Sequence, residues 1–209
     1  MAIRVEILDL GINNLASLRR GLADAGASNL GIIASSEESR GADLLVLPGV
    51  GAFGAATAEL ESRGLGELAQ AHVARGGYLF GVCLGMQLLS SSSEESPGAT
   101  GLSLISGSVQ KLESSGGARV PNMGWSPLHA RQDNPRFPSL EQDLDFYFVH
   151  SYALIPEAEG DIFSTSPFGD HEFVSSVLRD NVLGTQFHPE KSSKPGKQLL
   201  SNVLEWARG

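Results

Sequence analysis

Cysteine is almost absent from this 209-residue chain, in which Cys83 is the only example. A single thiol cannot form an internal disulfide, and it excludes a zinc site built from several cysteines. Cys83 can therefore be a buried thiol, a reactive thiol or one metal ligand among histidines.

Long hydrophobic runs are also absent. No segment approaches the roughly 18 apolar residues that a membrane-spanning helix needs, so we expect no membrane insertion. The N-terminal residues MAIRVEILDL carry acidic side chains where an export signal needs an unbroken apolar stretch. The sequence therefore predicts a cytoplasmic protein.

Basic residues are scarce: 15 Lys and Arg stand against 24 Asp and Glu, which gives a formal net charge of -9. This charge argues against nonspecific binding to nucleic acid or to an anionic membrane as the main function. It leaves open a local pocket for a small anion or zwitterion. Hydrophobic residues make up 41% of the chain, enough for one core, and we expect a single domain over residues 1–209.

The order of apolar segments indicates an α/β protein. Residues 3–8 predict a strand, and residues 15–26 carry leucines at helical spacing. The uninterrupted run of residues 44–47, Leu-Leu-Val-Leu, is typical of a strand buried on both faces of a parallel sheet. Residues 78–82 predict a further strand, and residues 84–89 the start of a helix. This alternation predicts a doubly wound, mostly parallel sheet flanked by helices.

The pattern changes in the second half of the chain. Residues 90–96 are rich in serine and glutamate and predict a solvated helix end and loop. Residues 102–187 are more strand-like, with a two-residue hairpin turn expected at Asp180-Asn181, so we expect an additional antiparallel β section. Residues 196–208 place apolar side chains on one face of a C-terminal helix.

The first chemical signal is Gly81-Val82-Cys83-Leu84-Gly85, at a predicted junction of strand and helix. Glycines two positions before and after a nucleophile permit the sharp turn of a nucleophile elbow, here with Cys in place of Ser. A helix N-terminus favours a thiolate, and the N–H of Leu84 would point at an oxyanion beside the sulfur. The alternative is a small buried cysteine between packing glycines.

The second signal is Gln186-Phe187-His188-Pro189-Glu190. On an extended segment, His188 and Glu190 would point to the same side, which predicts a row of thiol, imidazole and carboxylate. In that row His188 is the acid and base and Glu190 orients its ring. The alternative is a surface loop. Another His between carboxylates, His171, lies in a polar Gly-Asp loop.

The third signal is Pro48-Gly49-Val50-Gly51, which follows the predicted buried strand and so belongs at the carboxyl edge of the sheet. Its glycines allow backbone N–H groups to face a pocket. We expect Val50 or Gly51 to supply a second oxyanion donor. As a phosphate loop the segment is weak, because it lacks the Lys-Ser/Thr ending.

Together these segments resemble the class I, triad-type glutamine amidotransferases, over essentially the whole chain and including Met86-Gln87 after the elbow. The resemblance implies a flavodoxin-like fold and hydrolysis of glutamine to glutamate and ammonia through a γ-glutamyl thioester, with no cofactor and no metal. It implies a catalytic triad of Cys83, His188 and Glu190. The residues that it implies for holding glutamine are Gln87, His150, Ser151 and Tyr152.

Four further segments resemble the glutaminase subunit of imidazole glycerol phosphate synthase: residues 48–53, 122–125, 147–152 and 188–192. In that family a (βα)8-barrel cyclase subunit forms a heterodimer with the glutaminase. The cyclase uses the ammonia to convert the nucleotide PRFAR to imidazole glycerol phosphate and AICAR in histidine biosynthesis. The resemblance places four residues toward the partner and the ammonia route: Asn13, Trp125, Tyr147 and Lys191.

Other interpretations of these segments stay open. Trp125 and Tyr147 can be ordinary core aromatics, and Lys191 a solvated charge. The same chemistry can serve a synthase of the pyridoxal phosphate or purine pathway. A noncatalytic module that only binds a partner, or a cysteine peptidase or ester hydrolase on the same sheet, are further alternatives.

Overall fold

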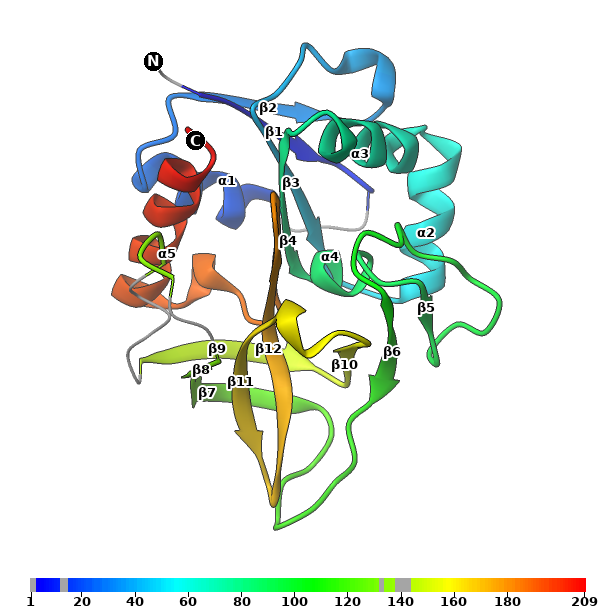
Figure 1. Cartoon of the computed structure of the whole chain (residues 1–209), viewed down its shortest axis with the longest axis vertical. Helices are drawn as coiled ribbons and strands as arrows, with labels where there is room; N and C mark the ends of the chain where they lie inside the picture. The colour runs from blue at the N-terminus through cyan, green and yellow to red at the C-terminus, as the bar shows by residue number, and fades with distance from the viewer. Residues whose placement is uncertain (1–2, 12–14, 132–133, 138–143) are drawn as a thin grey trace.

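The computed structural model of this chain describes residues 3–11, 15–131, 134–137 and 144–209. Its centre is an eight-stranded sheet in the order β2-β1-β3-β4-β13-β12-β11-β8 (Figure 1). The parallel strands are β1 (Arg4–Leu8), β2 (Asn29–Ile33), β3 (Leu44–Gly49), β4 (Tyr78–Cys83) and β13 (Val182–Thr185). The antiparallel strands are β12 (His171–Arg179), β11 (Ile162–Phe168) and β8 (His129–Ala130).

Helices cover both faces of the parallel half. Helices α1 (Leu15–Asp24) and α5 (Ser193–Trp206) lie on one face, and α2 (Phe53–Ser62) and α3 (Leu65–Ala74) on the other (Figure 1). In β3, Leu44 and Val46 pack with α1 and α5, whereas Leu45 and Leu47 pack with α2 and α3. The apolar run is continuous because both faces of this strand are buried, as predicted.

The strand-like second half forms smaller antiparallel units. Strand β7 (Asn122–Pro127) pairs with β9 (Asp145–His150), and β10 (Tyr152–Pro156) pairs with β6 (Gly107–Lys111), which also pairs with β5 (Ser92–Ser93). Short helices are α4 (Leu84–Gln87), η1 (Ser36–Glu38), η3 (Glu159–Asp161) and η4 (Pro189–Lys191). The hairpin expected at Asp180-Asn181 is confirmed, because Arg179 and Val182 pair across it.

Two local predictions were right only in part. Within residues 90–96, Ser92 and Glu94 are exposed, but Ser90 is fully buried and Ser93 is 5% exposed. Backbone N–H groups of the following segment donate to this region, including Ser103 N–H to the Ser90 carbonyl at 3.0 Å. The helix after Cys83 ends at Gln87, a single turn. In the part of the chain described here, no helix is long and apolar enough to cross a membrane.

The strand-to-helix junction is packed against backbone. A Cβ added at Gly85 would lie 1.7 Å from the Leu47 carbonyl oxygen, and one at Gly81 would lie 2.6 Å from the Gly85 carbonyl oxygen. Such contacts cannot be relieved by a side-chain rotation. The glycines of the elbow therefore permit α4 to lie directly against β3 and β4.

Gly85→Ala tests this packing. The added methyl group must displace the backbone of β3, so we expect the free energy of unfolding to fall by about 3 kcal/mol or more. Urea unfolding followed by circular dichroism measures it. Gly160→Ala is the control, because an added Cβ there meets nothing within 4 Å, and it should change stability by less than about 0.5 kcal/mol. Equal stability of the two variants would contradict the packing argument.

Candidate active site

The three segments singled out from the sequence meet at the carboxyl edge of the sheet. Cys83 ends β4 and pairs with Gly49, the last residue of β3. Strand β13 runs parallel to β4 on the other side, with Thr185 paired to Val82, and His188 follows three residues later. Parallel neighbours thus bring the elbow, the glycine loop and the His-Glu segment to one place.

Cys83 has a backbone conformation that is rare for a residue with a side chain, with φ 54° and ψ -109°. The thiol is 6% exposed. Its Sγ lies 3.6 Å from Gln186 Nε2 and 3.9 Å from the Val149 carbonyl oxygen. A strained nucleophile at a strand-to-helix turn is the geometry expected of a nucleophile elbow.

Cys83 borders a cavity of about 300 Å³. All residues that the sequence indicated for the oxyanion and for the substrate line it: Val50, Gly51, Leu84, Gln87, His150, Ser151 and Tyr152. They come from the loop after β3, from α4 and from the junction of β9 and β10. The structure therefore brings these candidates together around the sulfur, and their roles remain predictions.

His188 and Glu190 are in direct contact. His188 Nδ1 lies 2.8 Å from Glu190 Oε1, and the two side chains are 3% and 7% exposed. Because a carboxylate can only accept, Nδ1 carries the proton of this hydrogen bond. Nε2 of His188 makes no hydrogen bond to any residue described, so it is free for proton transfer.

The contact is not made in the way the sequence analysis expected. His188 and Glu190 do not lie on an extended segment, since Pro189–Lys191 form the 3-10 helix η4. Proline fixes a φ that suits the first position of a helix, which starts this turn. The turn brings the carboxylate back to Nδ1 of the imidazole ring.

Charge around His188 favours its protonated form. Burial acts to lower the pKa of His188, but interactions with Cys83 and with Glu190 outweigh it and raise the pKa to about 9. At neutral pH the ring is then an imidazolium, which can donate a proton from Nε2. The arrangement can supply a nucleophile and an acid in the same resting state.

His150 is held neutral at the other side of the cavity. Burial lowers the pKa of His150 to about 4. Its Nδ1 lies 2.8 Å from the Tyr152 carbonyl oxygen and its Nε2 3.0 Å from Asn122 Nδ2. Since the carbonyl accepts and the amide donates, Nδ1 carries the proton and Nε2 accepts. His150 thus fixes the bend between β9 and β10 and is unsuited to be a base.

Sequence reasoning missed Glu95, which also lines the cavity. Its Oε2 accepts a hydrogen bond from the Phe53 N–H at the start of α2, at 2.7 Å. Glu95 belongs to the segment predicted as a solvated loop. No local pattern marks it, because its place depends on the pairing of β5 with β6, which lies 14 or more residues away in sequence.

The aromatic residues predicted to face a partner are at the surface. Trp125 is 53% exposed and its neighbour on the same face of β7, Met123, is 64% exposed. The Trp125 and Tyr147 ring centroids are 5.9 Å apart, and Lys191 Nζ lies 5.9 Å from the Tyr147 ring centroid. Trp125 is therefore not a core residue. Asn13, the fourth residue in this prediction, lies outside the described residues.

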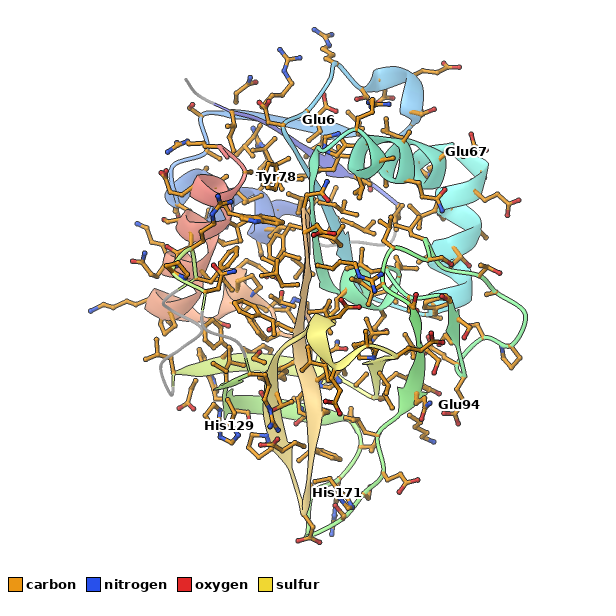
Figure 2. The ribbon with its side chains drawn as sticks, viewed as in Figure 1. Glu6, Glu67, Tyr78, Glu94, His129 and His171 are labelled. Carbon is orange, nitrogen blue, oxygen red and sulfur yellow. The ribbon has the colours of Figure 1, made fainter. Side chains whose placement is uncertain are left out.

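His171, the other histidine that lies between carboxylates in the sequence, is not among the residues that line this cavity. His171 is exposed at the start of β12 and lies at the tip of the β11–β12 hairpin (Figure 2). Its neighbour Glu172 contacts His129 instead, with Nδ1 and Oε1 2.6 Å apart. The hydrogen bond from His129 lowers the pKa of Glu172, so this acidic group has a structural partner.

The sequence profile of the family described as "Glutamine amidotransferase class-I" matches residues 6–206. The chain is 41% identical to "Imidazole glycerol phosphate synthase subunit HisH" of Synechococcus sp. (strain CC9605), with 100% of this chain and 97% of that protein covered. It is 42% identical to the protein of the same name from Pyrococcus furiosus, over 95% of this chain and 97% of that protein.

Solved structures share the fold. "Crystal structure of glutamine amidotransferase" superposes with a TM-score of 0.75 at 20% identity, covering 98% of this chain and 99% of that chain. "Structure of PurLQS from Thermotoga maritima" superposes with a TM-score of 0.76 at 17% identity, covering 99% of each chain. The predicted α/β architecture with an added antiparallel section is confirmed.

Titration of His188 tests the electrostatics of the site. We expect a midpoint near 9, so the stability contributed by the protonated ring is fully present below the ordinary value of 6.5 and is lost as the pH rises through about 9. Glu190→Gln should lower the midpoint, because it removes a raising interaction and leaves burial in place. NMR of ring-labelled histidine measures it, with Glu205→Gln on the exposed side of α5 as the control. An unchanged midpoint in Glu190→Gln would contradict the account.

Proposed function

The chain belongs to the class-I glutamine amidotransferase family, and on that premise we propose that it is the glutaminase subunit of an imidazole glycerol phosphate synthase. It hydrolyses glutamine to glutamate and ammonia, and the ammonia serves histidine biosynthesis. The observation that carries the proposal is that a strained Cys83, which borders the cavity, interacts with the buried His188–Glu190 pair.

The first half of the reaction forms a thioester. The Cys83 thiolate attacks the side-chain amide carbon of glutamine, and the carbonyl oxygen becomes an oxyanion. The N–H of Leu84 and an N–H of Val50 or Gly51 stabilise that charge, and each such donor contributes about 100- to 1000-fold in rate. His188 donates its Nε2 proton to the departing nitrogen, so ammonia leaves and the γ-glutamyl group stays on the sulfur.

The second half releases glutamate. His188, now neutral at Nε2, accepts a proton from water as the water oxygen attacks the thioester carbon. The carbon–sulfur bond breaks, and Cys83 returns to a thiolate beside an imidazolium. Glu190 accepts from Nδ1 throughout, which holds the ring in one orientation and stabilises its charge.

The cavity offers groups for the amino-acid end of glutamine. Glu95 is the one acidic side chain among the residues lining it, and a carboxylate there suits an α-ammonium group. His150, Ser151 and Tyr152 form another part of the cavity wall. Because His150 is neutral, it adds no charge that would oppose the ammonium.

The partner is a (βα)8-barrel cyclase subunit, with which this chain forms a heterodimer. Both relatives described above are named as subunits of a synthase. The exposed apolar side chains of Met123 and Trp125, next to Tyr147 and Lys191, are suited to be buried in that complex and to border the ammonia route. The cyclase then uses the ammonia to turn PRFAR into imidazole glycerol phosphate and AICAR, in the cytoplasm and without a cofactor in this subunit.

The alternatives have less support. A noncatalytic module would not need a buried His188–Glu190 pair that interacts with a strained cysteine. The likeness to the PurLQS structure is one of fold alone, at 17% identity. A peptidase or esterase needs an open groove for its substrate, whereas Cys83 borders a cavity of a size that suits an amino acid.

Cys83→Ala tests the proposal. In the complex with the cyclase, we expect glutamine hydrolysis to fall by more than about 10,000-fold, because no other group can form the thioester. Cyclisation of PRFAR with added ammonium salt should stay within about twofold of the wild type, since ammonia from solution bypasses this subunit; this rate is the control for folding and assembly. Retained glutaminase activity in the variant, or loss of ammonia-dependent cyclisation in an intact complex, would contradict the assigned role.

A further inference from the structure

Two glutamine side chains link the wall of the cavity to the sulfur of Cys83. Gln87 Nε2 lies 2.9 Å from the Tyr152 carbonyl oxygen and 3.0 Å from Gln186 Oε1. Gln186 Nε2 in turn lies 3.6 Å from Cys83 Sγ. Gln87 is 5% exposed and Gln186 is fully buried. The mechanism above gives Gln186 no role.

The orientation of each of the two glutamine amides is fixed by the group that it contacts, starting from the Tyr152 carbonyl. A backbone carbonyl only accepts, so Gln87 must turn its NH2 group toward Tyr152. Both hydrogens of that group are then used, one on Tyr152 and one on Gln186. Gln186 must accept with its oxygen, which leaves its own NH2 group facing the sulfur.

The backbone holds Gln186 at this point. The parallel register of β13 and β4 pairs Thr185 with Val82, so the next residues of the two strands, Gln186 and Cys83, leave the sheet side by side. The Gln186 N–H donates to the Ser175 carbonyl oxygen on β12 at 2.9 Å. Its side chain therefore starts from a fixed place beside the elbow.

The two forms of Cys83 need different partners. As a thiol, Cys83 can donate its S–H to the Val149 carbonyl oxygen. As a thiolate it can only accept. The protonated His188 is the charged group that interacts with it, Gln186 offers a neutral donor, and at 6% exposure Cys83 has little access to water. A buried charge without a hydrogen-bond donor is costly, and a donor to the charged form favours that form.

We propose that Gln186 is a further residue of the catalytic centre, whose side-chain amide donates a hydrogen bond to the Cys83 thiolate, and that Gln87, anchored on the Tyr152 carbonyl, positions it. The proposal rests on the role of Cys83 as the nucleophile of the proposed glutaminase. It gives Gln87 a positioning role in addition to the contact with substrate. Only the oxygen of Gln87 is left for the ligand, so it accepts from an N–H of glutamine.

The test measures the thiolate itself, by the rate of Cys83 alkylation with iodoacetamide as a function of pH. Gln186→Met keeps the length of the side chain and removes the donor. We expect its alkylation rate at pH 7 to fall about 10- to 100-fold and its pH profile to move upward, because a hydrogen bond to a charged group is lost. In the complex, kcat for glutamine should fall by a similar factor, with little change in KM.

Two further variants separate the role from general damage. Thr185→Val alters the neighbouring residue, also fully buried, whose hydroxyl donates to the Phe187 carbonyl oxygen at 3.2 Å. We expect its alkylation profile to match the wild type. Gln87→Met keeps Gln186 but removes the donor that orients the Gln186 amide. The alkylation profile of Gln87→Met should fall between those of the wild type and Gln186→Met. A Thr185→Val profile shifted as far as that of Gln186→Met would mean that the effect is structural and would overturn the proposal.

A second measurement needs no change at Gln186. In the wild-type chain, the side-chain amide proton of Gln186 should shift with pH in step with the alkylation rate, and Cys83→Ala should abolish that shift. A Gln186 side-chain amide signal that does not change with pH would overturn the proposal. An unshifted alkylation profile in folded Gln186→Met would do the same. A shifted profile in a chain that hydrolyses no glutamine would support this hydrogen bond and contradict the proposed function instead.

Discussion

The site depends on the backbone of Cys83, held at φ 54° and ψ -109°. Such a conformation costs of order 1–3 kcal/mol, so the surrounding structure has to impose it. It does so by contact, because β3 and α4 approach so closely that Gly85 can carry no side chain against the Leu47 carbonyl. In this conformation Cys83 lies at the carboxyl edge of the sheet and borders the cavity.

The parallel half of the sheet and the antiparallel section have different tasks. The parallel strands bring Cys83 and the His188–Glu190 segment to one edge, and helices pack on both faces of these strands. The antiparallel section closes the cavity from the opposite side, through β9 and the bend at His150. The same section carries Trp125 and Met123 outward. The antiparallel section therefore contains both a part of the cavity wall and the surface that the cyclase is proposed to cover.

Local patterns were sufficient where neighbours in sequence decide the structure. The apolar run of residues 44–47, the glycines around Cys83 and the Asp180-Asn181 turn each predicted their elements, because burial and allowed backbone angles act within a few residues. The residues whose positions the sequence did not predict are placed by contacts between distant segments. Glu95 reaches the cavity through the pairing of β5 with β6, and Gln186 reaches Cys83 through the register of β13 on β4. Pro189 by itself indicates a turn, but the spacing of His188 and Glu190 led to the prediction of an extended segment.

The proposed mechanism requires a covalent intermediate at Cys83. Acid quenching of the complex during turnover with carbon-13-labelled glutamine, followed by peptide mass spectrometry, measures it directly. We expect one labelled γ-glutamyl group on the peptide that contains Cys83, attached through sulfur and released by hydroxylamine. Label on another residue during glutamine turnover would contradict the proposed mechanism. Full turnover with no labelled peptide at any quench time, in an acid that preserves thioesters, would also contradict it.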